Sequence, residues 1–342
     1  MNTLRKFCTR NFSQNKIVLF AVLAVMLVLA CALSICYGSV SFSFSEIGDV
    51  LFGRDKTSSV YKIVTFVRLP RTFAAVFAGA ALAVSGVILQ VVLNNPLAGP
   101  STIGINSGAG LLVMMVTTLF PAMVQWTPFA AFLGALLASL FIYGIAACTG
   151  ASRVTIVLAG VAVSSFLSAG IDTLVTLFPD VAVGANSFMV GGFSNVTMDG
   201  VRLALLCIVA AFGLALLFGH DMNVLLLGDE TARSLGMRVG VYRFALIVIS
   251  SILAGSAVSF AGLLGFVGLI IPHGARFLVG EDNRCLIPTS ALCGGIFTVS
   301  SDLLARVLFA PYEIPVGIIM SFLGGPYFIY LLLQRKRSKI YD

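Results

Sequence analysis

Charged residues are scarce in this chain. Asp, Glu, Lys and Arg make up 10% of its 342 residues, whereas a typical soluble domain carries about 25%. The apolar residues fall in long uninterrupted runs, which a soluble core of this length could not bury. A run of about 18 residues or more is long enough to cross a bilayer as a helix. The sequence is therefore not that of an ordinary soluble domain and indicates an integral membrane protein.

Other absences narrow the possible functions. No Gly-Lys pair occurs anywhere, so the chain lacks the Gly-x-x-x-x-Gly-Lys-Ser/Thr loop that cradles nucleotide phosphates. Its 7 cysteines form no Cys-x-x-Cys pair and no His-bearing metal spacing. The 21 basic residues are scattered singly between apolar runs and build no nucleic-acid-binding stripe. We expect no catalytic residues, no bound metal, no cofactor and no nucleic-acid partner in this chain.

The apolar runs predict an all-α membrane bundle of ten spans in one domain over residues 17–333. Segments rich in Gly, Pro or charge separate the spans. Residues 1–16 and 334–342 are expected to be tails, and 220–239 is expected to be the longest cytoplasmic insertion. The spans are expected at residues 17–37, 70–92, 104–122, 127–148, 154–176, 200–218, 241–259, 261–280, 287–309 and 313–333.

Basic residues favour a topology with both termini in the cytoplasm. This placement puts about two thirds of the 21 Lys and Arg inside, as the positive-inside rule requires. The run Arg335–Lys336–Arg337 is the clearest anchor. The exception is the first external loop, whose flanks include Arg68 and Arg71. The first run, 17–37, is longer than the ~7–15 residues of a signal peptide core, so we expect an uncleaved helix.

Few ionisable residues fall inside the predicted spans, among them Asp172, His273, Arg276, Asp302 and Arg306. Charge at membrane depth costs about 2.5–3.5 kcal/mol at a helix centre, so each is a functional candidate. Asp302 and Arg306 are four residues apart, which predicts a local ion pair. His273 has no second ligand and is expected to pack. The spans offer little of the carboxylate relay that an ion-driven carrier needs, so we expect a partner to supply the energy.

The insertion 220–239 contains a short predicted helix over 229–236. Acidic residues at its start, Arg233 near its end and Gly236 after it suit a helix of two turns. Leu225, Leu226 and Leu235 are expected to present apolar surface to the cytosol. Such a segment either lies on lipid or inserts into a groove of a partner subunit.

Several blocks, in order, resemble the FecCD-type permeases. These are membrane subunits of binding-protein-dependent ATP-binding-cassette (ABC) importers for ferric siderophores, haem and cobalamin. The resemblance covers roughly residues 60–333. The blocks are Arg68–Leu69–Pro70–Arg71, the small-residue stretch 79–86, Gln90, Asn95–Pro96–Leu97–Ala98, 104–108, 228–236, 265–273, and Glu313–Ile314–Pro315–Val316–Gly317 with Gly325–Pro326.

The resemblance implies a ten-helix, vitamin B12 permease-like subunit of a type II ABC importer in the bacterial cytoplasmic membrane. It implies a second permease subunit, identical or homologous, and an extracytoplasmic binding protein. It also implies two cytosolic ATPases, which would bind ATP and Mg²⁺ in place of this non-catalytic chain.

Family motifs also imply roles for particular residues. The implied ATPase-coupling residues are Leu227, Gly228, Asp229, Glu230, Ala232, Arg233, Leu235 and Gly236. Arg68, Arg71 and Arg306 match arginines that meet glutamates of the binding protein. Asn95, Leu97 and Ser152 match two cytoplasmic gate loops, although Ala151 departs from the pair of hydroxyl residues known in the cobalamin branch.

Two other functions remain as alternatives to an importer of ferric siderophores, haem or cobalamin. The Gly-rich segments 79–86 and 262–268 hint at repeated halves, which would favour an ion-gradient-driven secondary transporter. An intramembrane serine protease would need a nucleophile such as Ser85 near His273. No Gly-x-Ser-x-Gly element accompanies Ser85, so the ABC importer permease is the leading hypothesis, with a ferric siderophore as cargo.

Overall fold

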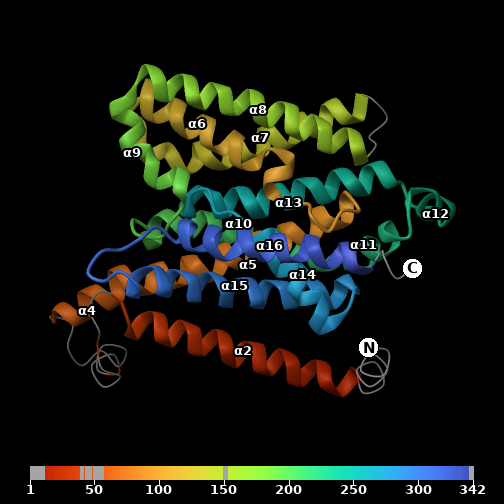
Figure 1. The fold of residues 1–342 in the computed structure, drawn as a ribbon, viewed down its shortest axis with the longest axis horizontal. Helices are drawn as coiled ribbons and strands as arrows, with labels where there is room; N and C mark the ends of the chain where they lie inside the picture. The colour runs from red at the N-terminus through yellow and green to blue at the C-terminus, as the bar shows by residue number, and fades with distance from the viewer. Residues whose placement is uncertain (1–11, 39–41, 43–47, 49–57, 149–152, 339–342) are drawn as a thin grey trace.

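A computed structural model describes residues 12–38, 42, 48, 58–148 and 153–338 of the chain. These residues form helices joined by short connections and contain no strand. The long helices run roughly side by side (Figure 1). In chain order the elements are α2 (Phe12–Cys36), α4 (Ser59–Ile63), the π-helical η1 (Val64–Arg68), α5 (Leu69–Val92), η2 (Pro100–Ile103), α6 (Ile105–Leu119), η3 (Pro121–Trp126), α7 (Thr127–Cys148), α8 (Arg153–Leu177), α9 (Pro179–Val190), α10 (Met198–Leu217), α11 (Gly219–Leu226), α12 (Asp229–Ser234), α13 (Val239–Ala261), α14 (Val267–Val279), α15 (Asn283–Val307) and α16 (Val316–Ser338).

The prediction of an all-helical membrane fold is confirmed. In the described residues, 7 helical stretches are long and apolar enough to cross a bilayer, and α6, α14 and the first part of α16 are shorter apolar helices. Each of the predicted spans overlaps one of these helices. Helices satisfy their backbone hydrogen bonds internally, which is why apolar runs adopt them in lipid.

The core is built around α5, which is buried along nearly its whole length. It packs against α13, α14 and α15. Small residues permit this close approach: a Cβ added at Gly79 would overlap the backbone of Gly294 on α15, and one added at Gly86 would overlap Gly268 on α14. The outer helices α2, α8 and α10 are mostly exposed, as expected where lipid or a partner covers them.

The two ends of the bundle carry different features (Figure 1). The amino end of α2, the carboxyl end of α16, α11 and α12 lie together at one end, here called the α12 end. At the opposite end, here called the α9 end, lie α4, α9 and the connection from α15 to α16. The amino end of the first long helix and the carboxyl end of the last one thus share one side of the bundle. Assignment of that side to the cytoplasm stays a prediction.

Several predicted boundaries need correction. The eighth span begins at Val267 instead of residue 261. Gly262 and Phe266, with φ angles of 70° and 65°, interrupt the helical backbone between α13 and α14. The segment after Pro179, treated as a separator in the sequence, forms α9. Helix α5 is preceded directly by α4 and η1, so the helical stretch starts at Ser59.

Candidate functional site

The segment between α10 and α13 lies at the α12 end and divides into a fixed part and a projecting part. In α11, Met222 and Leu225 are buried in the bundle. The side-chain oxygen of Asn223 accepts hydrogen bonds from the backbone and side-chain amides of Asn283, at the start of α15. Gly228, with a φ of 102°, then turns the chain, a conformation that glycine tolerates best. Helix α11 is therefore fixed to the bundle, and α12 projects from it (Figure 1).

Helix α12 presents an exposed surface of mixed character. Glu230 and Arg233 are exposed, and Leu227 and Leu235 on either side of the helix are 60% and 64% exposed. Ala232 is the buried side chain of this helix. The surface combines apolar contact area with charges of both signs.

The exposure of Leu235 confirms part of the apolar surface expected from the sequence. The expectation for Leu225 is wrong, because this side chain is 2% exposed and faces the bundle from α11. Leu226 is only half-buried. Gly236 ends the helix with a φ of 86°, and the Met237 amide donates to the Ala232 carbonyl at 3.0 Å, which closes the final turn. The role of this surface in binding an ATPase stays a prediction.

Asp229 differs from the other predicted coupling residues because its carboxylate points back toward the bundle. It accepts a hydrogen bond from Arg153, the first residue of α8, at 2.7 Å. It also accepts from Arg243 of α13 at 2.9 and 3.0 Å. Burial opposes the charged form, but the hydrogen bond from Arg243 and the charges of Arg243, Arg153 and Arg233 outweigh it, so the pKa of Asp229 lies below its ordinary value.

The first predicted gate loop is an ordered turn after α5. Asn94 has a φ of 46°, and the Asn95 amide donates to the Gln90 carbonyl at 3.0 Å. The side-chain oxygen of Asn95 accepts from the Leu97 amide at 3.0 Å, an Asx-type turn. Arg276 of α14 donates to the side-chain oxygen of Gln90, so the base of this loop is tied to α14.

The other predicted gate residues are Leu97 in the first loop and Ser152 in the second. Leu97 is half-buried, as is Asn95. Ser152 and the neighbouring Ala151 lie outside the described residues. The assignment of both loops as gates stays a prediction.

Three arginines at the α9 end form a buried cluster with two acidic residues. Arg68, Arg71 and Arg306 are only 5%, 5% and 3% exposed. Arg71 donates to Asp302 in a bidentate arrangement, with both N–O distances at 3.0 Å, and to Glu313 at 2.7 Å. Fork-shaped pairing of this kind is the strong geometry for a guanidinium and a carboxylate.

Asp302 also pairs with Arg306, at 3.1 Å, which confirms the ion pair predicted from their spacing. The other donors of Arg306 reach the carbonyl and hydroxyl of Ser34 in the last turn of α2. Arg68 donates to the carbonyls of Ile35 and Cys36 at 2.6 and 2.8 Å. Cations at the carboxyl end of a helix stabilise it, so the cluster fastens the end of α2 to α5 and α15.

The arginines thus face partners inside the chain. Their proposed meeting with carboxylates of a docking protein stays a prediction, and it requires that some of these hydrogen bonds be exchanged. Of the two acidic partners, Asp302 is 1% exposed and Glu313 is 32% exposed. Glu313 is the more accessible end of the network.

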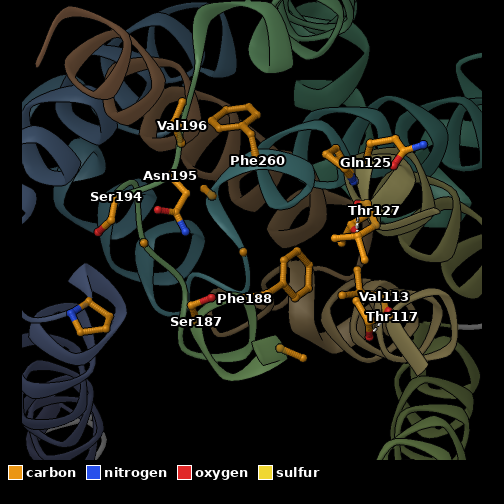
Figure 2. Close-up of a pocket in the computed structure, with 17 residues that line it drawn as sticks. Val113, Thr117, Gln125, Thr127, Ser187, Phe188, Ser194, Asn195, Val196 and Phe260 are labelled. Atoms are coloured by element: carbon orange, nitrogen blue, oxygen red, sulfur yellow. Dashed lines mark hydrogen bonds between the residues drawn. The ribbon is translucent and has the colours of Figure 1, made fainter. Parts of the chain in front are cut away.

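Two uncharged cavities lie beside α9. One, of about 470 Å³, is lined by Ser187, Asn195, Gln125, Phe188 and Phe260 among others (Figure 2). The other, of about 610 Å³, opens between α6, α9, α16 and the connection from α13 to α14. Hydroxyl, amide and apolar groups make up both linings, and no charged side chain is among the described residues of either.

Helix α8 carries an exposed polar stripe although it is apolar and long enough to cross a bilayer. Ser165, Ser168, Asp172 and Thr176 are all exposed, and their spacing of three or four residues places them on one face. Polar groups at membrane depth normally face a protein interior or water. The stripe therefore indicates that this face of α8 does not lie against lipid.

Sequence reasoning missed three features of these sites. It grouped Asp229 with the other coupling residues and did not foresee that its carboxylate pairs with Arg153 and Arg243. It did not foresee Glu313 as a partner of Arg71, which is 242 residues away. It also treated α9 as a connection. The signal available for α9 was Pro179 followed by Asp180 in the first turn, a pattern typical of helix starts.

Comparison with known proteins gives consistent matches along the chain. The sequence profile of the FecCD transport family matches residues 26–334. The iron(3+)-hydroxamate import system permease protein FhuB of Bacillus subtilis is 38% identical over 327 residues, which cover 94% of this chain and 84% of that protein. The cobalamin import system permease protein BtuC of Halobacterium salinarum is 40% identical over 286 residues, which cover 83% of this chain and 76% of that protein. A solved structure of a metal-chelate type ABC transporter in an inward-facing conformation aligns with a TM-score of 0.79 and 26% identity, covering 92% of this chain and 99% of that one.

Proposed function

This chain belongs to the FecCD transport family, and from that premise we propose that it is the membrane-spanning permease subunit of an ABC importer for ferric siderophores. A binding protein outside the cytoplasmic membrane would deliver the chelate to the α9 end. Two ATPases would bind at the α12 end and supply the energy of ATP hydrolysis. The chain itself would provide the pathway and carry out no chemistry.

One observation carries this proposal: α12 projects from a membrane bundle with exposed leucines beside exposed charges. Leu227 and Leu235 are 60% and 64% exposed, while Ala232 and Asp229 hold the helix to the bundle. A short helix of this kind, presented by a chain without a phosphate-binding loop, suits insertion into a groove of a soluble partner. The ATPase is the partner that an energy-requiring importer needs at this place.

The polar stripe on α8 supports a second permease subunit. Ser165, Ser168 and Asp172 are exposed in the single chain, and contact with lipid would be unfavourable for them. A second copy, or a homologous permease, that faces α8 would give these groups a protein or water-filled environment. The pathway for the cargo would then run between the two subunits, beside the cavity lined by α6, α9, α16 and the connection from α13 to α14.

The choice of a ferric siderophore rests on the relatives. The Bacillus protein is named for an iron(3+)-hydroxamate, whereas the archaeal one is named for cobalamin. The uncharged linings of the two cavities provide no fixed charge that would select among such cargoes. We therefore assign the selection to the binding protein, and haem or cobalamin are the competing cargoes in any uptake test.

The coupling surface is tested by a charge reversal on α12. Arg233→Glu should weaken copurification of the partner ATPase by at least about tenfold, equivalent to ~1.4 kcal/mol of binding free energy. Arg202→Glu is the matched control, because Arg202 is also exposed, with 76% of its side chain accessible, but lies near the start of α10, the helix that follows α9. Unchanged copurification of the ATPase with Arg233→Glu would argue against α12 as the coupling surface.

A further inference from the structure

Asp229 occupies a different position from the rest of α12. Its neighbours Glu230 and Arg233 are exposed, but its carboxylate lies between Arg153 of α8 and Arg243 of α13. The Arg243 side chain is only 4% exposed, whereas that of Arg153 is 23% exposed. One carboxylate therefore joins the projecting helix to two membrane helices.

The contact to α8 is the more informative of the two. Helix α12 packs mainly on α11 and α13, and its link to α8 is the 2.7 Å ion pair between Asp229 and Arg153. The same guanidinium also reaches the carbonyl of Leu225 at the end of α11, at 3.4 Å. Arg153 thus lies where the fixed helix, the projecting helix and α8 meet.

The position of Arg153 in α8 gives this link a mechanical consequence. Arg153 is the first residue of the helix that carries the polar stripe of Ser165, Ser168 and Asp172. A displacement of α12 that keeps the ion pair intact must displace the start of α8. Because a helix transmits axial movement as a rigid element, the polar face of α8 would move with it.

We propose that Asp229 is a positioning residue that transmits movement of α12 to α8 through Arg153, with Arg243 as the anchor on α13. This inference rests on the proposed function, because the movement of α12 is supplied by the ATPase. It gives Asp229 a role distinct from that of the outward residues: they bind the ATPase, and Asp229 couples the bound ATPase to the pathway.

The key variant is Arg153→Gln, which removes the link to α8 and leaves the ion pair of Asp229 with Arg243 in place. The complex of permease, ATPase and binding protein should still assemble. Stimulation of ATP hydrolysis by the loaded binding protein should fall by roughly five- to 150-fold, the range of a typical coupling free energy. Arg153→Lys, which keeps a cation near Asp229, should restore most of the stimulation.

Asp229→Asn is the second test variant. It should also reduce the stimulation of ATP hydrolysis by the loaded binding protein. The double variant Asp229→Asn/Arg153→Gln should be no worse than Asp229→Asn alone, because loss of the carboxylate already removes the contact to Arg153. Asp199→Asn is the matched control for loss of a carboxylate, since Asp199 is exposed and pairs only with exposed Arg202 in the described residues. It should retain wild-type stimulation.

The outcomes separate this inference from the proposed function. Full stimulation in Arg153→Gln, or loss of ATPase copurification in that variant, would overturn the coupling role. Additive losses in the double variant would also overturn it. Absence of ATP-driven uptake in the wild-type complex would instead contradict the proposed function itself.

Discussion

The buried cluster at the α9 end makes a quantitative prediction for Asp302→Asn. Two guanidinium N–H groups of Arg71 donate to this carboxylate, and the Nε atom of Arg306 lies 3.1 Å from it. Asn has nearly the same shape, but its amide nitrogen is a donor and would face one of these donors. The substitution also leaves two cations, 5% and 3% exposed, with Glu313 as the acid that still pairs with Arg71.

The expected loss can be estimated from what happens when one partner of a buried ion pair is removed. Such changes cost about 3–5 kcal/mol, because an uncompensated charge remains in a medium of low dielectric constant. Stability losses shift the melting temperature by about 2–4 °C per kcal/mol in chains of 150–250 residues. For a chain of 342 residues the shift per kcal/mol is smaller, about 1.4 °C, so we expect the melting temperature to fall by about 4–7 °C.

The assay is thermal unfolding in detergent, followed by the fraction that remains monodisperse after heating at a fixed rate. Asp199→Asn is the control, because its side chain is 85% exposed and an exposed pair contributes about 0–1 kcal/mol. The double variant Arg71→Gln/Asp302→Asn should recover part of the loss, since it removes one of the stranded cations. A melting temperature of Asp302→Asn within the error of wild type would refute the reasoning.

Three further predictions concern packing, coupling and pH. Gly86→Val should destabilise the fold by about 1–3 kcal/mol or more and lower the melting temperature, because a Cβ at this position meets the Gly268 backbone. Gly213→Val is the control and should leave the melting temperature unchanged, because the space around Gly213 is open. Leu235→Ala should leave the melting temperature unchanged, since this side chain is 64% exposed, yet weaken ATPase binding in a titration; equal affinity would contradict the proposed interface. The folded-state pKa of Asp229 is depressed, so its contribution is present above the ordinary carboxyl pKa and is lost only as the pH falls through the lower folded value. The difference in melting temperature between wild type and Asp229→Asn should therefore stay constant from about pH 8 to pH 5, and a difference that shrinks within this window would contradict the ion pairs described.

The helices were predictable because lipid imposes a simple rule on apolar segments. The run from residue 17 and the runs that match α7 and α13 required only length and hydropathy. The start of α14 was not predictable in this way, because Gly262 and Phe266 lie in an apolar stretch and only their backbone angles break the helix. Hydropathy records burial in lipid and does not record where a backbone turns.

The sequence predicted which residues belong to the candidate sites better than it predicted which residues they contact. Short-range pairs such as Asp302 with Arg306 follow from helical spacing. By contrast, Arg71 and Asp302 are 231 residues apart, and only packing of α5 on α15 brings them together. The same holds for Asp229, whose sequence neighbours face outward while it reaches Arg153, 76 residues away. Motifs identified which residues matter, and tertiary packing determined the direction each side chain faces.

The most direct measurement is accumulation of a radiolabelled ferric hydroxamate in proteoliposomes. The purified chain should be compared alone and together with its ATPase, binding protein and ATP. The account predicts accumulation above the outside concentration only in the complete system, and loss of that accumulation when Arg233→Glu replaces the wild-type chain. Uphill accumulation by the chain alone, driven by a proton gradient and independent of ATP, would contradict it.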